Sequence, residues 1–389
     1  MKILIVTDQY FAANNGMTIS ARRFASAWKK AGHEIRIMGW ANPEDVPEGE
    51  TAYLMKKQYI PFFDKLVSAQ GMTFAKPDKE KIREAVEWAD LIHFYVPFVL
   101  THAALKEAMR TGTPYTAAFH VQPENVSASI HMGNVRFFNS LIYHWFHFYV
   151  YKYCKHIHCP SKFIAGELVK HGYKEQLHVI SNGIDPDFKY RKIPKTAKYE
   201  GKFVVLMIGR MSIEKRQDVL ISAVAKSKYK DRIRLVLAGK GPRKEFLTAL
   251  AKRKKVDTEI TFFPKPALLD MIAMSDLYVH AADMEIEAMA CMEGFAGGLV
   301  PVIANSGRSA TPQFALDDRS LFKAGDSEDL AKKIDYWIEH SEERADMEHK
   351  YSELAEKYKL EDCAKALEEM FFTALREAEE KETENATSA

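Results

Sequence analysis

The stretch Ala281–Ser306, AADMEIEAMACMEGFAGGLVPVIANS, carries the pattern that decides the fold. It reads as a loop with Glu285, a helix rich in small residues, a stop at Gly297-Gly298 and an apolar strand over Leu299–Ala304. A helix that ends at glycine and leads into a buried strand is typical of an α/β unit beside a parallel sheet. If the front of this stretch were all helical, Glu285 and Glu293 would be about 12 Å apart along the axis. That span suits two parts of one extended ligand; an ordinary core helix with two solvated acids is the alternative.

The length of 389 residues predicts two domains, because a single core rarely grows that large. No window approaches 18 uninterrupted apolar residues, so no transmembrane helix is expected. Met1-Lys2 runs directly into a strand, without the features of a signal peptide. The four cysteines are sparse and lack metal-ligand spacing, which favours a reduced, cytoplasmic setting.

Charge is distributed unevenly along the chain. Residues 1–185 carry 21 Lys and Arg against 17 Asp and Glu, a balance of +4, whereas the total for the chain is +2. A weakly basic first half tolerates an anionic membrane surface without requiring one. Because no basic cluster is interleaved with aromatic residues, nucleic acid is not an expected partner.

The first half opens as a strand, Lys2–Thr7, a helix, Thr18–Ala31, and a second strand, Glu34–Gly39. The loop TDQYFAANNG between strand and helix is not G-x-G-x-x-G, so a nicotinamide cofactor is not expected. Gly16 instead lies just before the helix, where free N–H groups would face an anion such as a diphosphate. A plain tight turn is the alternative.

His120 follows the predicted strand Tyr115–Phe119, and ligands of parallel sheets bind beyond the carboxyl ends of strands. A structural histidine is the alternative at this position. Further along, Arg136–Tyr153 is unusually aromatic and helical in length. It is consistent either with an amphipathic helix at a bilayer interface or, as we favour for most of it, with a helix packed on the sheet.

After Asp185 the sequence becomes polar and irregular, which is typical of a linker. The second half then repeats the alternation of apolar strands and helices, so two doubly wound α/β domains are predicted. We place them at residues 1–190 and 191–360. At 361–389 we expect a C-terminal helix that packs back toward the first domain, and a polar tail whose last thirteen residues or so are frayed. Asp185-Pro186-Asp187 resembles an Asp-x-Asp metal motif, but its place in the linker favours a turn and no metal is expected.

The predicted strand ends of the second domain carry Arg210 and Lys215, then a Gly-Lys-Gly-Pro turn with Gly241, then Glu285 and Glu293. Arginine and lysine suit a diphosphate, and a carboxylate suits sugar hydroxyls. A surface salt-bridge cluster is the alternative.

With these motifs in order, the chain resembles the retaining glycosyltransferases of the GT-B type (group 1, family 4), which have two Rossmann-like domains facing across a cleft. The matching pieces span nearly the whole chain: ILIVTDQYFAANNGMTISARRFASAWKKAGHEI, FHVQPEN, CPSKFIAGELVKHGY, SNGID, IGRMSIEKRQDVLISA, the GKGP turn and the E-x7-E pair. Within the family, the chain resembles bacterial diacylglycerol glucosyltransferases and similar bacterial lipid or envelope glycosyltransferases.

The resemblance implies a role for each matching residue. Arg210 and Lys215 correspond to the pair that neutralises the donor diphosphate, and Glu293 to the acid that binds ribose. Glu285 corresponds to the acid that contacts the donor sugar, although Glu287 competes for that role. Further residues implied at the donor or the reacting sugar are Gly16, His120 and Gly241, with Ile286 and Ala288 in the backbone after Glu285.

The resemblance further implies transfer of glucose or galactose from a UDP-sugar to a lipid such as diacylglycerol at the inner membrane face. It implies retention of configuration, no metal and no cofactor, in a cytoplasmic enzyme that contacts the membrane peripherally through its first domain. A soluble or polysaccharide acceptor is the alternative. A nucleotide-sugar epimerase would need catalytic acids that we cannot identify, and a mere binding module would not need both cations, both acids and His120.

Overall fold

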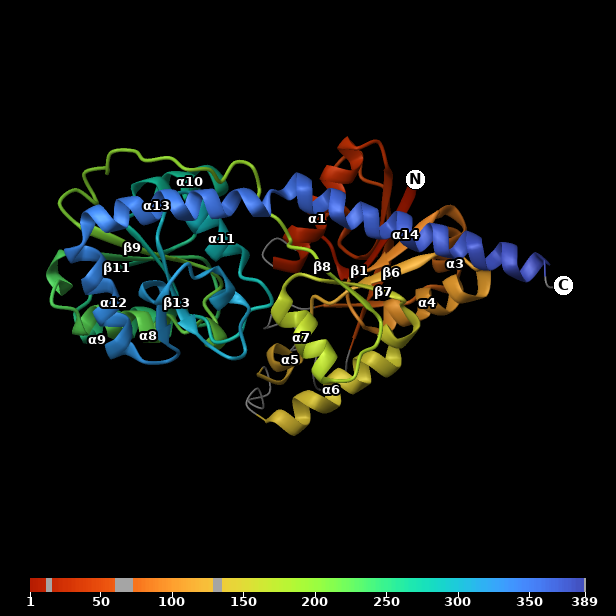
Figure 1. Ribbon diagram of the computed structural model, residues 1–389, viewed down its shortest axis with the longest axis horizontal. Helices are drawn as coiled ribbons and strands as arrows, with labels where there is room; N and C mark the ends of the chain where they lie inside the picture. The colour runs from red at the N-terminus through yellow and green to blue at the C-terminus, as the bar shows by residue number, and fades with distance from the viewer. Residues whose placement is uncertain (12–15, 60–72, 129–134, 388–389) are drawn as a thin grey trace. The chain divides into compact units, whose positions relative to one another are not determined.

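The computed structural model describes residues 1–11, 16–59, 73–128 and 135–387. The chain forms two compact units (Figure 1). Unit 1 combines Met1–Gly183 with Leu360–Ala389, and unit 2 is Ile184–Lys359. The division thus falls after Gly183 and after Lys359, whereas the sequence predicts boundaries at residues 190 and 360.

Unit 1 is built on an eight-stranded sheet in the order β4-β3-β2-β1-β5-β6-β7-β8. All neighbours are parallel except β3 and β4. The central strand β1 is buried along almost its whole length, as its continuous aliphatic sequence predicts. The strands are β1 (Lys2–Gln9), β2 (Glu34–Trp40), β3 (Ala52–Gln58), β4 (Phe74–Lys76), β5 (Leu91–Phe94), β6 (Tyr115–Ala118), β7 (His156–Cys159) and β8 (Gln176–Val179).

Helices cover this sheet, and the last of them comes from the end of the chain. Helix α14 lies beside α1 (Figure 1). Trp28 of α1 donates from Nε1 to the carbonyl oxygen of Ala364 at 3.1 Å, and its ring lies 5.0 Å from that of Phe371. The helices are α1 (Gly16–Lys30), α3 (Lys79–Trp88), α4 (Val99–Thr111), α5 (Pro123–Ala128), α6 (Arg136–Tyr149), α7 (Lys162–Lys170) and α14 (Leu360–Thr387).

Unit 2 has a six-stranded, fully parallel sheet in the order β11-β10-β9-β12-β13-β14. The chain moves outward from β9 in one direction and then returns to β12 on its other side. Such a switch in strand order is where ligands bind in open α/β sheets. The strands are β9 (Phe203–Ile208), β10 (Ile233–Ala238), β11 (Thr258–Thr261), β12 (Leu277–His280), β13 (Pro301–Asn305) and β14 (Leu321–Lys323).

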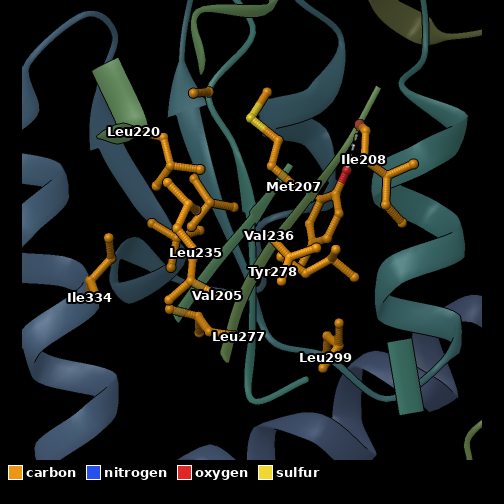
Figure 2. Packing of buried hydrophobic residues seen from close by; sticks show 14 of the residues in the cluster. Val205, Met207, Ile208, Leu220, Leu235, Val236, Leu277, Tyr278, Leu299 and Ile334 are labelled. Carbon is orange, nitrogen blue, oxygen red and sulfur yellow. Dashed lines mark hydrogen bonds between the residues drawn. The ribbon is translucent and has the colours of Figure 1, made fainter. Parts of the chain in front are cut away.

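Helices α10, α11 and α13 lie on one face of this sheet, and α8, α9 and α12 lie on the other (Figure 1). Between the layers, aliphatic side chains of β9, β10 and β12 pack with those of the helices, as Val205, Leu235 and Ile334 do in Figure 2. The helices are α8 (Gln217–Lys226), α9 (Lys244–Lys254), α10 (Lys265–Met274), α11 (Met289–Ala296), α12 (Ser327–Glu339) and α13 (Ser341–Ala355). Unit 2 is therefore a doubly wound α/β layer, and the α/β architecture predicted from the sequence is confirmed.

Three local predictions were wrong or incomplete. Residues 40–77, whose aromatic and aperiodic sequence predicts an irregular surface, contain β3 and β4. The short strands β7 and β14 were not predicted. The polar end of the chain, expected to fray, continues as helix α14 to Thr387.

Candidate active site

The loops after β9 and β10 in unit 2 approach each other closely. Met211 N donates to Lys240 O at 2.9 Å. A Cβ atom on Gly239 would lie 2.0 Å from Gly209 O, and one on Gly241 would lie 2.4 Å from Met211 O. Gly241 also has a φ of +159°, which an L side chain rarely adopts. Glycine is therefore required in the Gly-Lys-Gly-Pro turn by the approach of two backbones.

The loop after β12 carries Glu285, which is held by two side chains. Its Oε1 accepts a hydrogen bond from Nε2 of His280 at 2.9 Å and forms an ion pair with Nζ of Lys215. Burial by itself raises the pKa of Glu285, but the charge of Lys215 and the hydrogen bond from His280 outweigh it and lower the pKa to about 2. Glu285 is consequently ionised at neutral pH and fixed beside a cation.

A second carboxylate, Asp283, anchors the same loop. Its Oδ2 lies 2.9 Å from a guanidinium nitrogen of Arg216 and 3.6 Å from one of Arg308. Arg216 follows directly after Lys215 and has left-handed backbone angles, with φ of +52°. The loop after β12 is thereby tied to the segments that follow β9 and β13.

Backbone bonds complete this attachment. Ala310 N donates to Glu285 O at 2.9 Å, and Ser306 Oγ donates to Asp283 O at 2.7 Å. Because the carbonyl of Glu285 is bound as well as its carboxylate, the residue is fixed at both ends.

Glu285 itself lies outside a helix. Helix α11 begins at Met289, after Ala288 turns the chain with a left-handed φ of +75°. The helical spacing considered for Glu285 and Glu293 therefore does not apply. Glu287 and Glu293 are both buried, Glu293 on α11, and Ile286 is half-buried between the two acids of the loop.

The structure brings Lys215 and Glu285 into direct contact. Arg210 lies half-buried at the end of β9, with its carbonyl accepting from Nε2 of Gln217 at 2.8 Å. Gly241 follows β10, and Glu293 lies on α11 between β12 and β13 of the same sheet. Gly16 and His120 belong to unit 1.

In unit 1, Gly16 is the exposed first residue of α1; the loop residues 12–15 before it lie outside the described residues. His120 follows β6 and is buried, with its ring stacked on that of Tyr95 at 5.0 Å. Burial, with a smaller contribution from His158, holds the pKa of His120 well below its usual value, so the ring is neutral. Within the described part of the chain, its Nε2 has no hydrogen-bond partner.

Sequence reasoning missed four residues of this network: Arg216, His280, Asp283 and Arg308. A signal existed for His280, because it ends a buried strand, much as His120 directly follows one. Positions at the carboxyl end of a parallel strand face the ligand-binding edge of the sheet. Asp283 and Arg308 gave no such signal, since their pairing depends on how two loops fold together.

The Asp-x-Asp segment is engaged by a cation of the protein. Nζ of Lys265 lies 2.7 Å from Oδ2 of both Asp185 and Asp187. No group of three or more His, Cys, Asp or Glu side chains suited to a metal ion occurs among the residues that the structure describes. Over the same residues, no helix is both long and apolar enough to cross a bilayer.

Two family models match adjoining parts of the chain and together cover most of it. Residues 14–188 match "Glycosyltransferase Family 4", and residues 188–358 match "Glycosyl transferases group 1". The chain therefore belongs to the GT-B glycosyltransferases of the group 1 and family 4 type, and it transfers a sugar.

Similar proteins include an alpha-monoglucosyldiacylglycerol synthase of Streptococcus pneumoniae, which is 25% identical over 78% of this chain and 71% of its own length. A GDP-mannose-dependent alpha-mannosyltransferase of Mycolicibacterium smegmatis is 23% identical over 78% and 79%, respectively. Among solved structures, Anabaena HepE in complex with UDP and glucose shares the fold, with a TM-score of 0.74, 16% identity and coverage of 96% of this chain and 100% of its own.

Proposed function

We propose that this protein is a retaining glycosyltransferase that moves glucose or galactose from a UDP-sugar to a lipid acceptor such as diacylglycerol. In this proposal it works in the cytoplasm, in peripheral contact with the inner face of the membrane, and needs neither metal nor cofactor. The observation that carries the proposal is the Lys215–Glu285 pair at the switch point of unit 2.

The pair accounts for binding at both ends of a sugar–diphosphate bond. The lysine, with Arg210 on the same loop, offers fixed positive charge to the diphosphate, and the ionised carboxylate offers acceptors to sugar hydroxyls. As the bond breaks, the leaving diphosphate gains negative charge, and cations already in place stabilise that state more than the ground state. No protein nucleophile is assigned: the acceptor attacks from the face that the diphosphate leaves, and a donor phosphate oxygen assists its deprotonation.

The names of similar proteins support a UDP-hexose as the donor, but they also name GDP-mannose, which is a competing donor to be tested. HepE has UDP and glucose bound, and the streptococcal relative makes a glucosyl lipid, whereas the mycobacterial relative uses GDP-mannose. Discrimination between such donors depends on a few hydrogen bonds to the base and to the sugar hydroxyls.

The lipid acceptor is supported by the outer face of α6. Phe137, Leu141, Trp145 and Phe148 recur at helical spacing, and each is at least 47% exposed. The opposite face is packed: Tyr143 is buried and stacks on His171 at 3.9 Å between ring centroids. The helix thus combines the two possibilities that its sequence leaves open, an inner face in the core and an outer apolar stripe.

The charge around α6 suits an anionic bilayer. Between Glu124 and Glu167 the sequence contains no acidic residue but has four Lys and Arg. One of them, Lys152, has its Nζ 3.7 Å from the ring centroid of Phe148. Glu175 pairs with His147 of the same helix at 2.8 Å, but the exposed aromatic side chains are flanked in the sequence by cations, which favours the headgroup region of a negatively charged membrane.

The test is nucleotide release from UDP-glucose, UDP-galactose, UDP-N-acetylglucosamine and GDP-mannose, each with and without diacylglycerol vesicles. We expect release from UDP-glucose or UDP-galactose that depends on the vesicles. Release without lipid would indicate a soluble or polysaccharide acceptor. Release from GDP-mannose alone would overturn the proposal that the donor is a UDP-hexose. Glu285→Gln, in which the charge is lost but the shape kept, should abolish transfer.

A further inference from the structure

We propose that His280 is a positioning residue of the donor site. Hydrogen bonded between Tyr278 and Glu285, it keeps one carboxylate oxygen of Glu285 on Lys215 and leaves the other oxygen directed to the hydroxyls of the donor sugar. This inference rests on the proposed function, because it assigns the open oxygen to a nucleotide sugar.

The hydrogen bonds define the tautomer of the ring. Glu285 is ionised and can only accept, so Nε2 of His280, at 2.9 Å, must carry the proton that is shared with Oε1. The other ring nitrogen, Nδ1, lies 3.2 Å from the hydroxyl of Tyr278. The alternative acceptor for that hydroxyl, Ile208 O, is farther away at 3.5 Å (Figure 2). His280 therefore donates to Glu285 and is hydrogen bonded on its other side to the hydroxyl of Tyr278.

The two carboxylate oxygens of Glu285 have different contacts. Oε1 accepts hydrogen bonds from both Nε2 of His280 and Nζ of Lys215. Oε2 makes no hydrogen bond to any residue that the structure describes, while the side chain retains 12% of its exposure. One oxygen is thus committed to the protein, and the other is available to a ligand.

The support behind His280 is rigid. His280 and Tyr278 belong to β12, and both side chains are almost fully buried. Helix α11 packs directly on Tyr278: a Cβ atom on Gly294 would lie 2.9 Å from the Tyr278 ring. A group held on a strand by packing keeps its orientation more accurately than one on a loop, so His280 can impose geometry on the loop residue Glu285.

The cation in contact with Glu285 is Lys215, from the turn before α8. Cys291, whose thiol has a pKa raised by burial and by Glu285, lies on α11 with Glu293. Burial likewise raises the pKa of Tyr278, so Tyr278 and Cys291 are both neutral at pH 7 and add no charge beside Glu285.

The test compares binding of UDP-glucose with binding of UDP by calorimetry. The sugar should strengthen binding in the unchanged protein, and His280→Leu should remove that increment and lower kcat roughly 10- to 100-fold while the Kd for UDP is unchanged. His280→Gln, which can still donate to Glu285, should recover most of both. Tyr278→Phe should give an intermediate loss, whereas Tyr351→Phe, which removes a buried hydroxyl elsewhere in unit 2, should have no effect.

A second readout separates positioning from mere folding. His280→Leu should raise the pKa of Glu285, measured by carbon-13 titration of the carboxyl group, and shift the acid limb of the rate profile upward in pH. An unchanged sugar increment in folded His280→Leu, or failure of His280→Gln to do better than His280→Leu, would overturn the proposal. If the unchanged protein binds UDP but no sugar-bearing nucleotide more tightly, the proposed function fails instead, and the carbon-13 titration still decides whether His280 controls Glu285.

Discussion

The ammonium group of Lys215 and the carboxylate of Glu285 form an ion pair across 70 residues of sequence, and both side chains are largely buried. The pair joins the turn before α8 to the loop after β12. A buried charge that loses its partner is strongly destabilising, so the site and the stability of unit 2 depend on the same contact.

Replacing Lys215 by Met should therefore destabilise unit 2 in a pH-dependent way. The pKa of Glu285 is lowered from 4.5 to about 2, which corresponds to about 3 kcal/mol at neutral pH. Because the folded pKa is depressed, this contribution is complete above pH 4.5 and is lost as pH falls toward 2. Urea unfolding of Lys215→Met and of the unchanged protein should differ most at pH 7 and converge in acid. Lys226→Met, which breaks an exposed ion pair with Glu328, should change stability by less than about 1 kcal/mol at either pH.

The carboxyl group of Asp8 should give the stability of unit 1 the opposite dependence on pH. It is buried at the end of β1 and accepts from Ala75 N at 2.8 Å; burial raises its pKa to about 7, more than that hydrogen bond lowers it. A raised folded pKa means that stability falls as pH rises from 3.8 to 7, by up to about 4 kcal/mol. Asp8→Asn should raise the melting temperature at pH 8 but hardly at pH 4. The exposed Asp45→Asn serves as control, and equal pH profiles for the two variants would contradict the assignment.

A methyl group in the Gly-Lys-Gly-Pro turn should separate the loops after β9 and β10. Gly241→Ala places Cβ 2.4 Å from Met211 O at an unfavourable φ, so we expect a loss of about 1–3 kcal/mol and weaker binding of UDP. Gly307→Ala, where no atom lies within 4 Å of the added carbon, is the matched control. Thermal melting and a UDP titration measure both effects, and identical results for the two variants would exclude a role for the close approach.

Removing the outer stripe of α6 should weaken membrane binding without unfolding unit 1. Trp145 is 47% exposed, so Trp145→Ser should cost little stability but at least about tenfold in affinity for anionic vesicles, from the apolar area lost. Phe246→Ser on α9 of unit 2 is the control, since Phe246 is similarly exposed at 49%. Co-sedimentation at low salt measures the affinity. Equal retention of the two variants on vesicles would remove the support that α6 gives to a lipid acceptor.

The sequence predicted those elements whose apolar patterns are long. Strands β1 and β2 begin at the predicted residues, Lys2 and Glu34, and end one or two residues beyond the predicted ends, because each keeps an apolar pattern over most of its length. Strand β7, with the sequence HIHC, and strand β14, with LFK, are too short and mixed to show a period. Their pairing in the sheet, which the local sequence does not encode, makes them strands.

The same limit applies to the candidate site. The sequence placed Lys215 and Glu285 at strand ends, and strand order makes such ends neighbours. Their direct contact, and the part played by His280 beneath them, depend on the path of the loop after β12. That path is determined by bonds to Ser306 and Ala310, which lie beyond the next strand.

The return of α14 to unit 1 has a consequence for how the chain is synthesised. The residue that accepts the hydrogen bond of Trp28, Ala364, is synthesised 336 residues later in the chain. All of unit 2 emerges in the interval and can fold first. Until α14 is made, the apolar side chains of α1 that pack on it, such as Trp28, lack that cover, and apolar surface exposed on a nascent chain favours binding by chaperones.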